Sequence, residues 1–181
     1  MSVTAGDPGG SAVDNDPAEE TAGPEEAFGA LVSYSRGETV LHPNRDCYLQ
    51  VVGALYQAGY TMCVDVCAAD YLLAGEARPL PAGIQPERYE VVANFINHGQ
   101  RSRIRVRVQV PGTDPTCDSL WSLHAGAEGP EREAYDLFGI AFTGHPDMTR
   151  ILMPETWQGH PLRKDYAIGR IPVQFKGAPS T

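Results

Sequence analysis

The chain has 181 residues, enough for one globular domain with a hydrophobic core and too few for two large ones. No apolar run approaches the ~20 residues that a membrane-spanning helix needs, and the amino terminus lacks the basic and apolar regions of a signal peptide. The net charge is -9, from 23 acidic and 14 basic residues. These features predict a soluble intracellular protein and argue against an integral membrane or secreted protein.

The acidic residues are concentrated at the amino terminus. Seven acids and no base precede Phe28: Asp7, Asp14, Asp16, Glu19, Glu20, Glu25 and Glu26. This segment is otherwise rich in Gly, Ala and Pro, so burial of apolar side chains cannot offset the entropy cost of ordering it. We predict a disordered acidic tail over residues 1–27. An alternative is that this tail docks onto a basic partner.

A β-hairpin and a helix are predicted next. Residues 31–35 and 39–42 are strand-like and flank Arg36-Gly37, a turn with Gly at a suitable position. A helix should then begin at Asn44 as N-cap and end before Gly59. Its apolar face has helical spacing and consists of Cys47, Val51, Ala54, Leu55 and Ala58. We expect this face to pack on a sheet.

Three further strands are predicted over residues 61–69, 88–97 and 103–110. In the last strand, arginines at 103, 105 and 107 alternate with aliphatic residues, which indicates one buried face and one basic face. Such a basic face can neutralise nucleic-acid phosphates, but no aromatic residues are interleaved with it. We therefore favour cross-strand ion pairs with acids on the neighbouring strands, namely Asp65, Asp70 and Glu90.

The four cysteines, Cys47, Cys63, Cys67 and Cys117, lack the close spacing of a zinc or iron-sulfur site. Cys63 and Cys67 would lie about 13 Å apart in a strand, too far for a disulfide. We predict that all four are small buried hydrophobic residues in a reducing compartment.

A short helical piece is predicted around residues 118–124, and a second helix over residues 130–138 with Pro130 at its first position and Gly139 at C′. The fold class is therefore α+β. We expect a two-layer domain over residues 28–129, with the β-hairpin, a helix and three further strands in one sheet. Residues 130–181 should form the short helix and a long irregular carboxy-terminal arm.

A Gly-His-Pro motif occurs twice in this arm, at residues 144–146 and 159–161, each time after an aromatic residue and a spacer. Proline disfavours helix at the preceding His, so neither copy should be helical. Apolar residues between and after the copies, including Ile151, Leu152 and Trp157, nevertheless need a surface to bury against. We predict an arm that lies on a partner, with folding back onto its own domain as the alternative.

The same residues allow an enzyme hypothesis. His145, Asp147, His160 and Asp165, together with Glu131 or Glu133, include the atom types of a metal site or of an acid-base pair. However, no two histidines lie four residues apart on a predicted helix, and no Ser or Cys lies in a nucleophile elbow. We favour imidazoles that hold their bends through hydrogen bonds to backbone or acidic groups.

The segments at residues 131–140, 142–147, 150–154 and 157–166 resemble the signature block of the C subunit of the proton-pumping NADH:quinone oxidoreductase, the 30-kDa-subunit family of respiratory complex I. The upstream order of hairpin, helix and strands is also similar to the α+β domain of that family. The chain departs from the family pattern at residues 125–129, which replace an Asn-Trp-containing approach, and at Ala167, where Pro is common.

This resemblance implies a non-catalytic subunit of the peripheral arm, on the cytoplasmic side of the cell membrane. It implies no cofactor in this chain, with FMN and iron-sulfur clusters in partner subunits, and contact with the D subunit of complex I near the quinone site. The complex would pass electrons from NADH to quinone and translocate protons. An equivalent subunit of a related complex with another electron donor is the alternative.

We expect no catalytic, cofactor-binding or metal-binding residues in the chain. The expected partner interface comprises Glu131, Arg132, Glu133, Asp136, His145, Pro146, Asp147, Arg150, Trp157, His160, Pro161, Arg163, Lys164, Asp165 and Tyr166. Arg132, Arg150 and Arg163 are candidates for pairing with carboxylates on the partner or within the arm. Trp157 and Tyr166 are candidate anchors, because large aromatic residues contribute much of the binding energy at interfaces.

Overall fold

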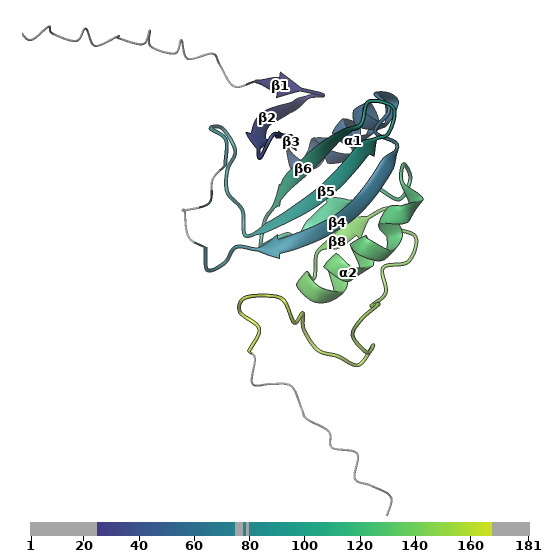
Figure 1. The fold of residues 1–181 in the computed structure, drawn as a ribbon. Coiled ribbons are helices and arrows are strands. Elements are labelled where there is room, and N and C mark those ends of the chain that lie inside the picture. The colour runs from purple at the N-terminus through teal and green to yellow at the C-terminus, as the bar shows by residue number, and fades with distance from the viewer. Residues whose placement is uncertain (1–24, 75–77, 79, 168–181) are drawn as a thin grey trace, which may run out of the picture.

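The computed structural model describes residues 25–74, 78 and 80–167. It contains a six-stranded sheet in the order β1-β2-β3-β6-β5-β4 and a two-stranded sheet of β7 and β8 (Figure 1). Two α-helices accompany the sheets, so the predicted α+β fold is confirmed. None of the helices in the described ranges is long and apolar enough to cross a membrane. The predicted acidic tail lies outside the described residues except for its last three, where Glu26–Ala27 form β1.

The predicted hairpin is confirmed. Strands β2 (Ala30–Ser35) and β3 (Glu38–His42) pair antiparallel. The two turn residues, Arg36 and Gly37, both have positive φ, at 53° and 80°, as a type I′ turn requires.

The first helix is shorter than predicted. A 3-10 turn over Arg45–Cys47 precedes α1 (Tyr48–Gln57), and Asn44 makes no side-chain capping bond. The buried face is Tyr48, Val51, Val52 and Leu55, whereas the predicted face residue Ala54 is exposed. These four residues have the spacing i, i+3, i+4 and i+7, so the buried stripe is centred on Val51 and Val52 and Ala54 lies beside it. Gly59 ends the segment with φ 93°, as predicted.

The three further strands agree with prediction to within one residue: β4 (Met62–Asp70), β5 (Tyr89–Asn97) and β6 (Ser102–Val110). On β6 the even-numbered aliphatic residues are buried in the core. On the opposite face Arg107 pairs with Glu90 at 2.8 Å and Arg105 with Glu38 at 3.1 Å. These pairs support the ion-pair interpretation of the basic stripe. Asp70 also pairs, but with Arg88, and Asp65 forms no ion pair with any described residue.

The prediction of four buried cysteines is confirmed for Cys117, holds in part for Cys47 and Cys63, and is wrong for Cys67. Cys117 is 3% exposed, Cys47 and Cys63 are half-buried, and Cys67 is exposed. Cys67 lies on β4, the edge strand of the sheet, and pairs with Val92. Val92 pairs in turn with Arg107, so Cys67 lies on the basic face of the sheet, opposite the core, whereas its neighbour Val66 on the other face is buried. Burial raises the pKa of the Cys63 thiol to about 12.

A second layer follows the sheet: β7 (Thr116–Asp118), a 3-10 turn (Ala125–Ala127), α2 (Glu128–Phe138) and β8 (Ala141–Thr143). The predicted helical piece at 118–124 is wrong, because residue 118 ends a strand that pairs with β8 and a turn follows. Pro130 is the third residue of α2, still in the first turn where no N–H partner is needed. The α2 helix packs against β4 (Figure 1). Residues 144–167 contain no helix or strand.

Candidate partner-binding arm

The arm, residues 144–167, leaves β8 and passes below α2 (Figure 1). Because it has no helix or strand, its backbone groups need partners other than a regular ladder. Many of those partners are groups on α2. The arm is therefore an extended segment with a defined conformation.

Asp136 of α2 is the main attachment point of the arm. Its carboxylate is fully buried, and Oδ2 accepts three successive backbone N–H groups, from Ile151 at 3.1 Å and from Leu152 and Met153 at 2.8 Å each. Oδ1 accepts Nη1 of Arg150 at 2.6 Å. Burial alone raises the pKa of Asp136, but the bonds from Met153, Arg150 and the other donors outweigh it and hold the pKa below its usual range.

Each histidine of the repeated motif is held by backbone groups. His145 donates from Nε2 to the Glu128 carbonyl at 3.0 Å and accepts at Nδ1 from the Asp147 N–H at 3.0 Å, which assigns a neutral imidazole. His160 donates from Nδ1 to the Asp136 carbonyl at 2.9 Å, and burial lowers its pKa. The predicted hydrogen-bonding role of both histidines is confirmed.

The metal-site hypothesis gains no support from this geometry. Within the described ranges, no group of three or more His, Cys, Asp or Glu side chains gathers where it could hold an ion. Both ring nitrogens of His145 already bond to the backbone, so metal binding there would break one of these bonds. Asp147 and Glu133 lie exposed. What the structure shows for both histidines is bonding to the backbone at the bends of the arm.

Gly139 lets the arm approach the end of α2 closely. It has φ 73°, and a Cβ built there would lie 2.5 Å from Nε2 of His160. Arg163 reaches the same point and donates from Nε to the Phe138 carbonyl at 2.5 Å, while the Leu162 N–H bonds to the Leu137 carbonyl at 3.0 Å. A side chain at residue 139 would displace this part of the arm.

A second attachment point joins the end of the arm to the main sheet. Arg88 bonds through Nη2 to Asp70 at 3.0 Å and to Asp165 at 2.8 Å. Asp70 also accepts the Lys164 N–H at 2.9 Å. The bonds to Asp70 and Asp165 raise the pKa of Arg88. The sequence predicted Asp70 only as a cross-strand ion-pair partner and did not connect Asp70 or Arg88 to the arm, because they lie 94 and 77 residues from their arm partners.

Two residues of the predicted interface are fully buried inside the chain. Glu131 accepts Ser119 Oγ at 2.6 Å and the Leu120 N–H at 2.7 Å, and burial raises its pKa. Together with Asp136 it is 0% exposed, so neither carboxylate presents a surface to a partner. The inclusion of Glu131 and Asp136 in the interface is corrected accordingly. Both instead join α2 to neighbouring segments.

The arginines of the arm region also bond within the chain. Arg132 donates to the Thr149 carbonyl at 3.1 Å, and Arg150 donates to the Gly159 carbonyl at 3.0 Å in addition to Asp136. These polar contacts therefore agree with the alternative prediction, in which the arm folds back on its own domain. Trp157 and Tyr166 are half-buried, and a Cβ built on Gly159 would lie 3.0 Å from the Tyr166 ring.

Unlike many of its polar groups, which bond within the chain, several apolar side chains of the arm are exposed. Leu152 is 58% exposed, Leu162 48% and Ile151 42%. Pro146 and Lys164 are also exposed, and Pro161 is half-buried. Nε1 of Trp157 is buried without a hydrogen-bond partner in the described part of the chain. The arm thus bonds many of its polar groups within the chain and leaves several apolar side chains exposed.

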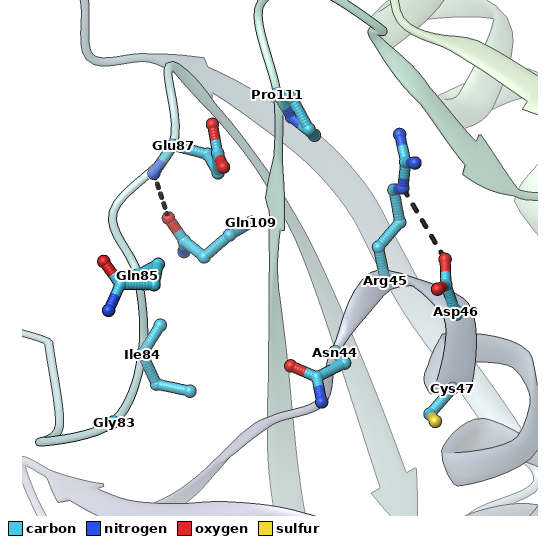
Figure 2. Close-up of a pocket in the computed structure, with 10 residues that line it drawn as sticks. All are labelled: Asn44, Arg45, Asp46, Cys47, Gly83, Ile84, Gln85, Glu87, Gln109 and Pro111. Carbon is cyan, nitrogen blue, oxygen red and sulfur yellow. Dashed lines mark hydrogen bonds and ion pairs between the residues drawn. The ribbon is translucent and has the colours of Figure 1, made fainter.

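A pocket of about 420 Å³ lies elsewhere, between the 3-10 turn before α1 and the loop before β5. Figure 2 shows Arg45 and Asp46 on one side and Gln85, Glu87 and Gln109 on the other. Arg45 already pairs with Asp114 at 2.8 Å, and Gln109 accepts the Glu87 N–H at 3.3 Å. No lining residue belongs to the arm.

Comparison with known proteins places the chain in a family. The family model described as "Respiratory-chain NADH dehydrogenase, 30 Kd subunit" matches residues 41–171. The C subunit of NADH-quinone oxidoreductase from Saccharopolyspora erythraea is 38% identical over 150 residues, which cover 81% of this chain and 56% of the relative. The corresponding C subunit from Mycobacterium tuberculosis (H37Ra) is 39% identical over 158 residues, covering 85% of this chain and 62% of the relative. The chain therefore spans 56% to 62% of the length of these two relatives.

Solved structures agree with this placement. The trypsin-resistant fragment (1–134) of Nqo5 is 33% identical with a TM-score of 0.57, covering 66% of this chain and 89% of the fragment. A chain of the membrane-bound sulfane sulfur reductase, an archaeal respiratory membrane complex, is 18% identical with a TM-score of 0.63, covering 84% of this chain and 90% of its own. The second likeness shows the fold alone. On the family model and the identities to its relatives, the chain belongs to the 30 kDa subunit family of respiratory-chain NADH dehydrogenases.

Proposed function

We propose that the chain is a non-catalytic, structural subunit in the peripheral arm of an NADH:quinone oxidoreductase. Its arm would bind a companion protein, the D subunit of that complex, near the quinone site. The observation that carries this proposal is the exposure of three apolar side chains of the arm, Ile151, Leu152 and Leu162, on a backbone that is bonded to α2 at residues 151–153 and 162.

The geometry favours binding because the arm is held in position before a partner arrives. Asp136 bonds to residues 151–153. At the end of the arm, Asp70 bonds to the Lys164 N–H and Arg88 pairs with Asp165. A preorganised segment pays less conformational entropy on association than a disordered one. Complete burial of one exposed leucine side chain contributes about 1.5–3 kcal/mol. Ile151, Leu152 and Leu162 are 42–58% exposed, so each would contribute roughly half of that on association.

Electron transfer would take place in other subunits. FMN and iron-sulfur clusters are proposed for the partners, and none for this chain. The complex would sit on the cytoplasmic side of the cell membrane, pass electrons from NADH to quinone and translocate protons. A related complex that uses another electron donor remains the alternative, and the cofactors of the co-purified subunits distinguish the two.

Affinity purification of the tagged full-length chain from its own cells tests the role of the arm. We expect Leu152→Asp to reduce recovery of the companion subunits several-fold, because a carboxylate would be desolvated at the interface. Val64→Asp is the matched control, since Val64 is an aliphatic residue of β4 with similar exposure, 48%. Normal recovery with Leu152→Asp would contradict the proposal. Truncations must keep β8, because Ile140 and Phe142 are buried.

A further inference from the structure

Two exposed leucines outside the arm follow the end of β4. Leu73 is 77% exposed, the highest value among the large apolar side chains in the described ranges, and its neighbour Leu72 is 46% exposed. Adjacent large apolar side chains at this exposure are unfavourable in water unless another surface covers them. Neither residue belongs to the family signature or to the predicted interface.

One buried carboxylate connects these leucines to the arm. Asp70 is 6% exposed, and its Oδ1 accepts the Leu72 N–H at 3.0 Å while its Oδ2 accepts the Lys164 N–H at 2.9 Å. Leu72 and Lys164 are therefore held on opposite oxygens of one side chain. Leu162 lies two residues before Lys164, and Leu73 directly follows Leu72. Asp70 thus joins the backbone at Leu72 to the backbone of the arm two residues after Leu162.

The charged groups around this junction lie at its margin. Arg88 neutralises Asp70 and reaches Asp165, whose side chain is 52% exposed, and Lys164 is also exposed. Apolar side chains beside solvent-accessible charges are the usual arrangement of a protein interface, in which the core is apolar and the rim is polar. The junction has the composition expected of a site for another polypeptide.

We propose that Leu72 and Leu73 extend the apolar surface of the arm, and that one companion protein of the complex covers both with a complementary apolar surface. This inference rests on the proposed function of the arm and adds a contact from the main sheet domain. The choice of occupant rests on this shared carboxylate: Asp70 ties the Leu72 segment to the arm two residues from Leu162, so a partner that buries Leu162 would reach that segment as well. Asp70 then positions two separate parts of one binding surface.

The test compares three substitutions in the tagged full-length chain, purified as the complex. Leu73→Asp is expected to reduce recovery of the companion subunits several-fold, as Leu152→Asp does, while the control Val64→Asp leaves recovery unchanged. Circular dichroism and thermal unfolding of each isolated variant check that the chain remains folded. Each residue is exposed, so we expect no large loss of stability.

Photo-crosslinking identifies the occupant directly. A photoreactive residue at position 73 and one at position 152 should capture the same companion polypeptide in the purified complex. Normal recovery with Leu73→Asp, together with loss from Leu152→Asp, would overturn this inference and leave the function of the arm standing. A crosslink from position 73 to another part of the same chain would also overturn it. Normal recovery with both variants would instead overturn the proposed function.

Discussion

The sheet domain and the arm are stabilised in different ways. In β6, backbone pairing on both sides and a row of buried aliphatic residues spread the stabilisation over many groups. In the arm, a few side chains on other elements, chiefly Asp136 and Asp70, hold the backbone. Single substitutions at these carboxylates should therefore affect the arm far more than single surface substitutions affect the sheet.

The largest effect is expected for Asp136→Ala. The substitution leaves Arg150 and three backbone N–H groups without their acceptor, and removal of one partner of a buried ion pair costs about 3–5 kcal/mol. We expect faster hydrogen exchange at residues 151–153 and a lower free energy of unfolding in denaturant. Asp147→Ala is the control, because Asp147 is exposed. Equal exchange in the two variants would show that the carboxylate does not hold the arm.

A pH effect is expected in the sheet domain. Burial, aided by Arg107, lowers the pKa of His42 to about 4, so the folded state favours neutral His42. Because the unfolded state binds this proton near pH 6.5, stability is full above that pH and falls as pH drops toward 4. Between pH 7.5 and 5 the loss should be about 2 kcal/mol, at 1.36 kcal/mol per unit. His42→Asn should flatten this part of the stability profile, and an unchanged slope would refute the assignment.

Gly139→Ala should destabilise the chain by about 1–3 kcal/mol, the usual cost of strained backbone, because Ala disfavours the left-handed region and its Cβ would meet His160. Gly129→Ala is the control within α2. A Cβ at residue 129 would have no other atom within 4 Å, and Ala forms helix better than Gly. The free energy of unfolding should therefore rise by about 0.5–1 kcal/mol. Thermal unfolding measures both, and equal shifts of the two variants would contradict the close approach of the arm.

The smallest effect is expected for Asp165→Asn, which weakens the attachment to Arg88. The carboxylate is half exposed, so the change in global stability should stay below about 1 kcal/mol and diminish with added salt. Faster exchange of the amides at residues 164–166 should be the clearer signal. If exchange there matches the unsubstituted chain, the bonds to Asp70 alone are sufficient to hold the end of the arm.

The elements that the sequence predicted well are those with local signals. The alternation in β6, the turn at Arg36-Gly37 and the cap at Gly139 each depend on neighbouring residues only. The errors came where other elements decide the outcome. Residues 116–118 form a strand because β8 lies beside them, and Cys67 is exposed because it lies on the non-core face of the sheet, in register with Val92 and Arg107.

The candidate site shows the same division. The proline and glycine of each Gly-His-Pro motif predicted a bend in the arm. The apolar run between the two motifs indicated side chains that need another surface to bury against. The sequence could not predict which groups provide the hydrogen-bond and ion-pair partners of the arm. Asp70 and Arg88 are remote in sequence from Lys164 and Asp165. The burial of Glu131 and Asp136 likewise depends on segments that pack around α2.

By itself, the sequence determined the family, the α+β class, the order of the main strands and the irregular course of the arm. These follow from backbone preferences and from apolar periodicity, which act over a few residues. Only the tertiary structure decided that the carboxylates of α2 and β4 hold the arm, and that its aliphatic side chains remain exposed. The physical reason is that a hydrogen bond or an ion pair depends on distance in space, and the fold sets that distance across more than ninety residues.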